Sequence, residues 1–229
     1  MAERWAVELG GGVRLAGLAA GEPGGEPLVL LHGLGEGAAG WVPLLPALAR
    51  GRRVYAVDLR GHGASSWPGE YSLELMRDDV LAWLDRAGLA RVELVGHSMG
   101  GVVAYLLAAL HPARISRLVL EDVPVPRPRV AVAPVRPEGD LAFDWEMVLA
   151  VRAQLDRPDP AWRELLPLIT APTLVLSGGP ASHIPQSWLA ELAGRIPGAA
   201  LRTVPVGHLI HQDAPEEFLA TVQEFLGLG

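Results

Sequence analysis

Two hydrophobic patterns alternate along the chain. Residues 27–33, "PLVLLHG", are almost continuously apolar, which is typical of a strand buried on both faces of a sheet. Residues 72–89 instead repeat apolar positions at helical spacing, with Ser72 placed as an N-cap and Gly88 near the C-terminal end. Strand-like and helix-like segments follow one another in this way over most of the sequence.

The succession of predicted elements indicates a fold class. Predicted strands lie in residues 7–18 (a hairpin), 27–33, from 52 into a Gly-rich loop, 92–95, 115–122, 171–179 and 199–208. Predicted helices lie in residues 40–51, 72–89, 102–110, about 143–155, 161–168, 186–196 and 215–228. Strands that alternate with helices predict an α/β fold with a mostly parallel central sheet and helices on both faces.

Residues 123–170 interrupt this alternation. Their first part, "VPVPRPRVAVAPVRPEGD", is rich in proline and lacks helical periodicity, and two short helices follow. We expect a single domain over residues 1–229 with a small cap-like insertion at about 123–170. Phe143, Trp145 and Met147 in its first helix are candidates for a substrate pocket, although the packing face of a helix explains them equally well.

The segment "VELVGHSMGGVV", residues 92–103, passes from a strand to a helix through five residues. Small residues at Gly96 and Gly100 relieve crowding in such a sharp turn, and Ser98 stands at its apex. The pattern G-x-S-x-G between a strand and a helix is a specific signal for a serine nucleophile. A serine hydroxyl needs an adjacent base, usually a histidine that a carboxylate orients.

Seven histidines compete for the role of this base. His208 is the strongest candidate, because it ends a predicted strand and a loop at the carboxyl edge of the sheet can carry it to Ser98. His211, one helical turn later, is expected to serve packing or capping. The developing oxyanion also needs donors, and we expect them at the backbone N–H groups of Met99 and of Leu34 in the loop "LLHGLGEG".

Four motifs then resemble a known family. "LLHGLG", "DLRGHGAS", "GHSMGG" and "GHLIHQDAPEEF" occur in the order typical of the α/β-hydrolase superfamily, in its esterase, lactonase and haloperoxidase-like branch. The resemblance implies an α/β-hydrolase fold with a triad in the chain order serine, acid, histidine. Ala181 departs from the pattern, because it stands where the family usually carries its aspartate.

The resemblance offers a second place for the acid. Some relatives carry it after the strand that follows the nucleophile helix, and Asp122 occupies that position here. Glu121 is an alternative acid, and a dyad of Ser98 and His208 is another. Asp58 also ends a predicted strand, but we expect it to brace its own loop.

Composition excludes several function classes. The net charge is −7 with no prominent run of Lys or Arg, so neither nucleic acid nor an anionic membrane is expected as a partner. The chain has no cysteine, which excludes a thiolate nucleophile and disulfides. It shows no apolar secretory leader and no apolar run of about 18 residues, so we expect a cytoplasmic protein. The pattern does not define an oligomeric state.

We therefore expect a serine hydrolase that cleaves a small-molecule carboxylic ester through an acyl-enzyme, with no metal and no organic cofactor. Dehalogenase and epoxide-hydrolase chemistry is disfavoured, because the resembling families use an aspartate where this chain has Ser98. Two alternatives stay open. One is hydrolysis of a lactone or of a carbon–carbon bond by the same triad, and the other is a catalytically silent fold that binds a ligand.

Overall fold

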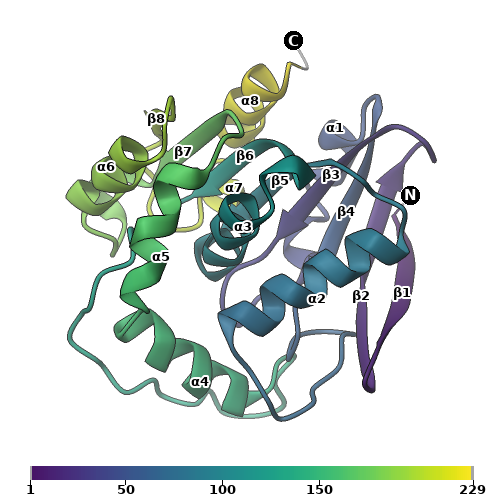
Figure 1. The fold of residues 1–229 in the computed structure, drawn as a ribbon, viewed down its shortest axis with the longest axis horizontal. Coiled ribbons are helices and arrows are strands. Elements are labelled where there is room, and N and C mark those ends of the chain that lie inside the picture. The colour runs from purple at the N-terminus through teal and green to yellow at the C-terminus, as the bar shows by residue number, and fades with distance from the viewer. Residues whose placement is uncertain (1, 228–229) are drawn as a thin grey trace.

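The computed structural model describes residues 2–227 and contains one eight-stranded sheet (Figure 1). The strands are β1 (Glu3–Gly10), β2 (Val13–Gly21), β3 (Glu26–Leu31), β4 (Arg52–Asp58), β5 (Val92–His97), β6 (Ile115–Glu121), β7 (Thr173–Ser177) and β8 (Ala200–Thr203). Their spatial order is β1-β2-β4-β3-β5-β6-β7-β8. The pairs β1–β2 and β2–β4 are antiparallel, and the other neighbours are parallel. This is the mostly parallel sheet that the sequence predicts.

Helices cover both faces of the sheet (Figure 1). They are α1 (Leu45–Leu48), α2 (Leu73–Arg86), α3 (Ser98–Leu110), α4 (Trp145–Asp156), α5 (Pro160–Leu165), α6 (Gln186–Arg195), α7 (Ile210–Asp213) and α8 (Pro215–Leu226). One apolar cluster packs α2, α3 and α6 on one face, and a second packs α1 and α8 on the other. Along β3, Val29 and Leu31 belong to the first cluster and Leu28 and Leu30 to the second, because successive strand residues face opposite sides.

The structure differs from the prediction at several elements. The last strand ends at Thr203 and not at His208, because the Val206 N–H bonds back to the Val204 carbonyl oxygen (2.8 Å) and not to β7. His208 therefore lies in a loop beyond the strand, and the short α7 that follows it was not predicted. Residues 40–51 form only single helical turns, and the end of the predicted last helix, Leu228, lies outside the described residues.

Residues 123–170 leave the sheet between β6 and β7. Their first part forms no regular element apart from an isolated bridge between Phe143 and His62, and α4 and α5 follow. Asp144 caps α4 by accepting a hydrogen bond from the Glu146 N–H (3.1 Å). The loops that leave the carboxyl ends of β5, β6 and β7 meet on the side of the sheet where this segment lies, which marks the place of the site (Figure 1).

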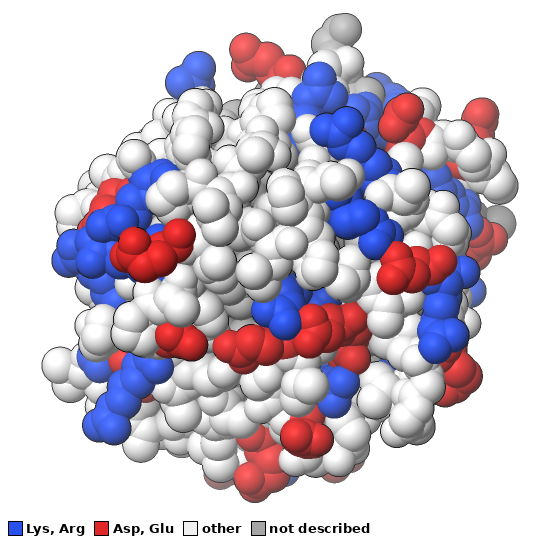
Figure 2. Space-filling model, viewed as in Figure 1, with Lys and Arg blue, Asp and Glu red and all other residues white. Residues whose placement is uncertain are grey.

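Charge on the surface is mixed. Acidic and basic side chains are interspersed on the face shown in Figure 2, with broad uncharged areas between them. Within residues 2–227, no helix has the length and apolar character needed to cross a bilayer. The cytoplasmic location stays a prediction.

Candidate active site

The turn from β5 to α3 holds Ser98 in a strained conformation. Its φ is 50°, in the left-handed region that residues with a Cβ rarely adopt. The neighbouring glycines are required by close contacts, because a Cβ on Gly96 would lie 2.6 Å from the Gly100 carbonyl oxygen. A Cβ on Gly100 would lie 2.5 Å from the His32 carbonyl oxygen. The turn thus presents a half-buried Ser98 at the N-terminus of α3.

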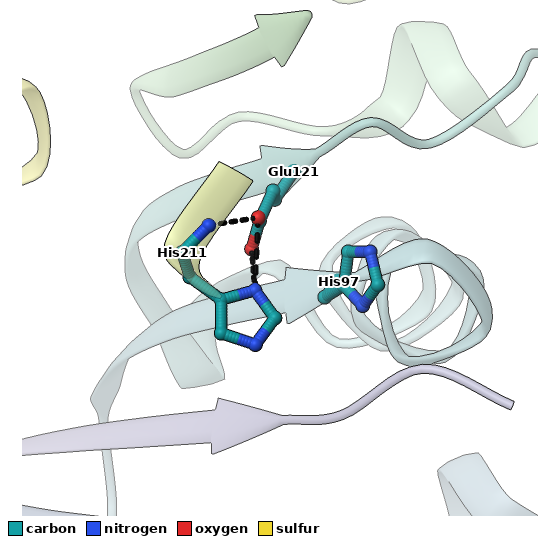
Figure 3. Close-up of side chains that lie close together, drawn as sticks. All are labelled: His97, Glu121 and His211. Atoms are coloured by element: carbon teal, nitrogen blue, oxygen red, sulfur yellow. Dashed lines mark hydrogen bonds and ion pairs between the residues drawn. The ribbon is translucent and has the colours of Figure 1, made fainter. Parts of the chain in front are cut away.

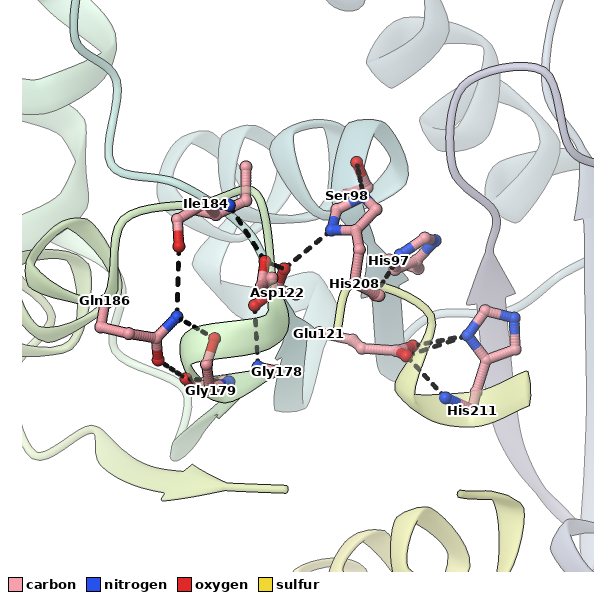
Figure 4. A network of polar contacts seen from close by, with 12 residues as sticks. His97, Ser98, Glu121, Asp122, Gly178, Gly179, Ile184, Gln186, His208 and His211 are labelled. Atoms are coloured by element: carbon pink, nitrogen blue, oxygen red, sulfur yellow. Dashed lines mark hydrogen bonds and ion pairs between the residues drawn. The ribbon is translucent and has the colours of Figure 1, made fainter. Parts of the chain in front are cut away.

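Ser98, His208 and Asp122 lie in one chain of hydrogen bonds (Figure 4). His208 Nε2 is 2.9 Å from Ser98 Oγ, and His208 Nδ1 is 2.7 Å from Asp122 Oδ2. A proton on Nδ1 that donates to the carboxylate leaves Nε2 as the acceptor for the serine hydroxyl. The structure therefore brings together the nucleophile, base and acid candidates of the sequence, in the geometry that nucleophilic catalysis requires.

Asp122 is as strained as Ser98. It has a φ of 47°, and these two are the non-glycine residues with positive φ within residues 2–227. Its Oδ1 accepts a hydrogen bond from the Gly178 N–H (2.9 Å), and the Ser182 hydroxyl donates to its Oδ2. Both donors belong to the loop after β7, which has Ala181 at the family's usual acid position. The loop after β7 therefore holds the carboxylate of Asp122, which directly follows β6, in place.

Two backbone donors border the space in front of Ser98. The Met99 N–H belongs to the first turn of α3, where helical N–H groups have no intrahelical acceptor. The Leu34 N–H makes no hydrogen bond to another residue of the described range 2–227. The Leu34 loop is held against α3 by a hydrogen bond from the Gly100 N–H to the His32 carbonyl (3.1 Å). Leu34 and Met99 thus fit a two-donor oxyanion site.

A second histidine–carboxylate pair lies next to the triad (Figures 3 and 4). Glu121 Oε1 accepts a hydrogen bond from the His211 backbone N–H (2.8 Å). The two Glu121 oxygens also lie 2.9 and 3.0 Å from His211 Nδ1. Both side chains are fully buried. Glu121 and Asp122 are adjacent in sequence, yet each serves a different histidine.

His97 connects this pair to the triad. Its Nδ1 lies 3.2 Å from Glu36 Oε2, and its Nε2 lies 3.0 Å from the backbone oxygen of His208. Burial would lower the pKa of His97, but the negative charges of Glu121 and Glu36 and these hydrogen bonds raise it to about 9. Burial would likewise raise the pKa of Glu36, and the hydrogen bond and charge of His97 lower it to about 2. His97 is thus a buried cation at neutral pH.

The same three residues could in principle hold a metal ion. Ligand atoms of His97, Glu121 and His211 lie within 4.8 Å of one another. Both ring nitrogens of His97 already make hydrogen bonds, and a protonated imidazole has no lone pair to offer a metal. This donor set fits a hydrogen-bonded ion network better than a metal centre.

A cavity of about 380 Å³ opens over Ser98. Its walls combine apolar side chains from α3, α6 and residues 123–170 with three arginines. Apolar members of the wall include Val102, Tyr105, Val125, Leu155, Trp162 and Trp188. The cavity has the size expected of a small-ligand site.

The predicted pocket residues Phe143, Trp145 and Met147 do not line this cavity, to which α4 contributes Arg152 and Leu155. Met147 is fully buried, with its Cγ 2.8 Å from the place of a Cβ on Gly61. The Phe143 ring lies over Gly35. The face of α4 that carries Met147 therefore packs against the body of the protein, and a different face of the helix reaches the cavity.

Sequence reasoning also missed several residues of the site. Glu36 and His97 are polar residues inside Gly-rich motifs, and this position could have identified them as candidates for the site. No sequence pattern marks Ser182 or Arg152. Only the folded chain brings Ser182 to Asp122 and Arg152 to the cavity. Asp58 braces its loop as expected, with Oδ2 accepting a hydrogen bond from the Ala64 N–H (3.1 Å).

Comparison with known proteins defines the class. A family profile described as alpha/beta hydrolase fold matches residues 26–148. The chain is 32% identical to sn-1-specific diacylglycerol lipase ABHD11 of Mus musculus, over 87% of this chain and 80% of that protein. The chain therefore belongs to the α/β-hydrolase family.

Other relatives extend the comparison. Epoxide hydrolase A of Mycobacterium tuberculosis (strain ATCC 25618 / H37Rv) is 39% identical, over 55% of this chain and only 40% of that protein. Among solved structures, the enol-lactonase from Burkholderia xenovorans LB400 superposes with a TM-score of 0.82 at 27% identity, over 95% of this chain and 98% of that one. The family and these relatives identify a hydrolase on the α/β fold.

Proposed function

We propose that the protein hydrolyses carboxylic esters through an acyl-enzyme formed on Ser98. The observation that carries this proposal is the continuous hydrogen-bond chain from Ser98 Oγ through His208 to Asp122, with distances of 2.9 and 2.7 Å. This chain supplies a nucleophile, a base and an orienting acid together. A lipase and an enol-lactonase among the relatives favour an acyl–oxygen bond as the one that is broken.

The reaction follows from the geometry. His208 Nε2 takes the hydroxyl proton as Ser98 Oγ attacks the acyl carbon, and the N–H groups of Leu34 and Met99 stabilise the oxyanion. The acyl–oxygen bond then breaks, and the leaving alcohol takes its proton from His208. Water next attacks the acyl-enzyme, with His208 as base, and the acid leaves as the proton returns to Ser98. Asp122 stays ionised and stabilises the imidazolium.

A lactone is the second candidate substrate. Its ring closes through an internal ester, so the same steps open it and the alcohol stays tethered to the acyl group. The likeness to the enol-lactonase over nearly the whole chain favours this candidate.

A catalytically silent ligand-binding protein fits the structure less well. Left-handed backbone at a residue with a Cβ costs on the order of 1–3 kcal/mol. Ser98 and Asp122 both keep this conformation, at the two ends of the triad. Strain retained at both positions favours a catalytic role over simple binding.

Turnover of p-nitrophenyl esters of graded acyl length tests the proposal. We expect the wild type to hydrolyse the shorter esters and Ser98→Ala to show no rate above the uncatalysed reaction. Ser187→Ala is the matched control, because Ser187 is an exposed serine on α6. Turnover by Ser98→Ala close to wild type would contradict the role of Ser98, and a wild type inactive on every ester and lactone would contradict ester hydrolysis.

A further inference from the structure

We propose that the cavity over Ser98 accepts esters or lactones whose far end carries a carboxylate, and that Arg152 binds this carboxylate. The inference rests on the proposed ester hydrolysis and specifies its substrate class. It starts from the charge of the cavity wall, which is opposite to that of the whole chain.

Three arginines, Arg127, Arg129 and Arg152, line the cavity of a chain with a net charge of −7. Among the described residues that line it, Glu36 is the one carboxylate, and it lies against His97. The cavity wall is therefore positive in an otherwise acidic protein. Such a local field attracts anions and concentrates them at the site.

Two of these arginines are already compensated. Arg127 Nη2 lies 2.6 Å from Glu191 Oε2. Arg129 Nε lies 2.6 Å from Asp156 Oδ1, a fully buried partner. These ion pairs fix the two guanidinium groups and reduce their free charge.

Arg152 on α4 has no carboxylate partner within residues 2–227. Its Nη2 makes one long contact, 3.4 Å, to the carbonyl oxygen of Val132. Its Nε is buried and has no hydrogen-bond partner in the same range. Arg152 nevertheless lines the cavity, where a guanidinium without a carboxylate partner can pair with an anionic group of a bound molecule.

Arg152 lines the same cavity as Ser98 and His208. The ring of His183 stands 4.3 Å from the ring of His208, measured between centroids. Burial lowers the pKa of His183; the neighbouring His208 and the charges of Arg129 and Arg152 act in the same direction, and the charge of Asp122 acts against them. A substrate in this cavity of about 380 Å³ can therefore contact Ser98 and Arg152 together.

Guanidinium chemistry matches this ligand. An arginine can hold a carboxylate by two parallel N–H···O bonds, which fixes direction as well as charge. A single carboxylate on the substrate would balance the charge of Arg152, which has no carboxylate partner within residues 2–227. Val125, Leu155 and Trp162 supply apolar wall, which suits a hydrocarbon spacer between the carboxylate and the ester.

Two esters of equal acyl length test the inference: mono-p-nitrophenyl adipate, which is anionic, and p-nitrophenyl hexanoate, which is neutral. We expect the wild type to favour the adipate in kcat/KM, and Arg152→Met to lower the adipate-to-hexanoate ratio by about tenfold or more. Arg152→Lys should give an intermediate ratio, because lysine keeps the positive charge but lacks the two parallel N–H donors of the guanidinium group. Arg157→Met, an exposed arginine at the end of α4 outside the cavity, should leave the ratio unchanged.

Binding separates this inference from the proposed function. Calorimetry on the Ser98→Ala protein should show tighter binding of monomethyl adipate than of dimethyl adipate, and adding Arg152→Met should remove the difference. Such binding without turnover of either ester would uphold the carboxylate site and overturn ester hydrolysis. Turnover of both esters at equal kcat/KM, or equal ratios for Arg152→Met and Arg157→Met, would overturn the carboxylate site alone. Neither turnover nor preferential binding would overturn both.

Discussion

The protein builds two histidine–carboxylate pairs on adjacent residues, and the two differ in what surrounds the histidine (Figure 4). In the Asp122–His208 pair, the histidine side chain is 21% exposed and its second nitrogen faces Ser98 Oγ at 2.9 Å. This nitrogen can accept a proton from a group that reacts with substrate. The pair therefore has the access that a general base needs.

In the Glu121–His211 pair, the histidine side chain is 1% exposed. Its ring stacks on Trp41 with 4.2 Å between centroids, and its second nitrogen lies 3.3 Å from Gln212 Nε2. No substrate atom can reach it there. The pairing itself is the same, so the two pairs differ in exposure and in the partner of the second nitrogen, and we propose that these two features determine the role of each pair.

Replacing His208 or His211 by alanine should give the largest difference in kcat between the two pairs. We expect His208→Ala to lower kcat for p-nitrophenyl acetate by about 10⁶-fold, because the nucleophile and base act as a unit. His211→Ala should change kcat by less than about tenfold and lower the free energy of unfolding, because it leaves Glu121 buried without its partner. Steady-state kinetics and urea denaturation measure the two effects. A greater loss of kcat in His211→Ala would reverse the assignment.

Replacing each carboxylate by its amide tests the same difference between the two pairs. Asp122→Asn keeps the shape but presents the wrong hydrogen-bond character to His208 Nδ1, and we expect a loss of about 10⁴ in kcat. Glu121→Gln should cost less than about tenfold in kcat and about 3 kcal/mol in the free energy of unfolding. The same assays apply. Similar kcat losses in both variants would show that the two pairs act as one catalytic unit.

The network around His97 predicts a pH dependence of stability. The pKa of His97 rises from an ordinary 6.5 to about 9 on folding, so its stabilisation is present below pH 6.5 and lost as the pH rises to about 9. The pKa of Glu36 falls from 4.5 to about 2, so its stabilisation is present above pH 4.5 and lost as the pH falls toward 2. Urea denaturation should show stability falling from pH 6.5 to 9. His97→Gln should flatten this alkaline limb, and an unchanged limb would contradict the charged state of His97.

Ser182→Ala should give the smallest effect. The variant removes one hydrogen bond to Asp122 Oδ2, while the Gly178 N–H still holds Oδ1. We expect kcat to fall by about three- to tenfold, which corresponds to the net contribution of about 0.5–1.5 kcal/mol from one typical hydrogen bond. Ser187→Ala is the control. A loss as large as that of Asp122→Asn would mean that Ser182 alone sets the position of the acid.

The parts of the site that could be predicted from the sequence are the local ones. The turn around Ser98 is specified by five consecutive residues, since its glycines and its backbone strain depend on near neighbours. Asp122 could be inferred because β6 ends beside β7, so an acid lost at one strand end can be supplied from the next. The first inference needed the local motif, and the second needed the resemblance to relatives that carry the acid after the strand following the nucleophile helix.

The cavity could not be predicted in the same way. The residues that line it depend on which face of α4 packs against the body of the protein. Met147 lies on the packed face, and Arg152 lies on a face that reaches the cavity. The end of the last strand likewise depends on a local turn, in which the Val206 N–H bonds to the Val204 carbonyl oxygen. Helix rotation in an insertion is determined by tertiary packing, which the periodicity of the insertion does not specify.

Covalent labelling with a fluorophosphonate, followed by mass spectrometry of the digested protein, tests the central claim most directly. The reagent modifies a serine only when a base activates it, so the wild type should carry one adduct, on Ser98. The adduct should form at close to the wild-type rate in Glu121→Gln and far more slowly in Asp122→Asn and His208→Ala. Absence of an adduct, or an adduct on another residue, would contradict the assignment of Ser98 and His208 as nucleophile and base.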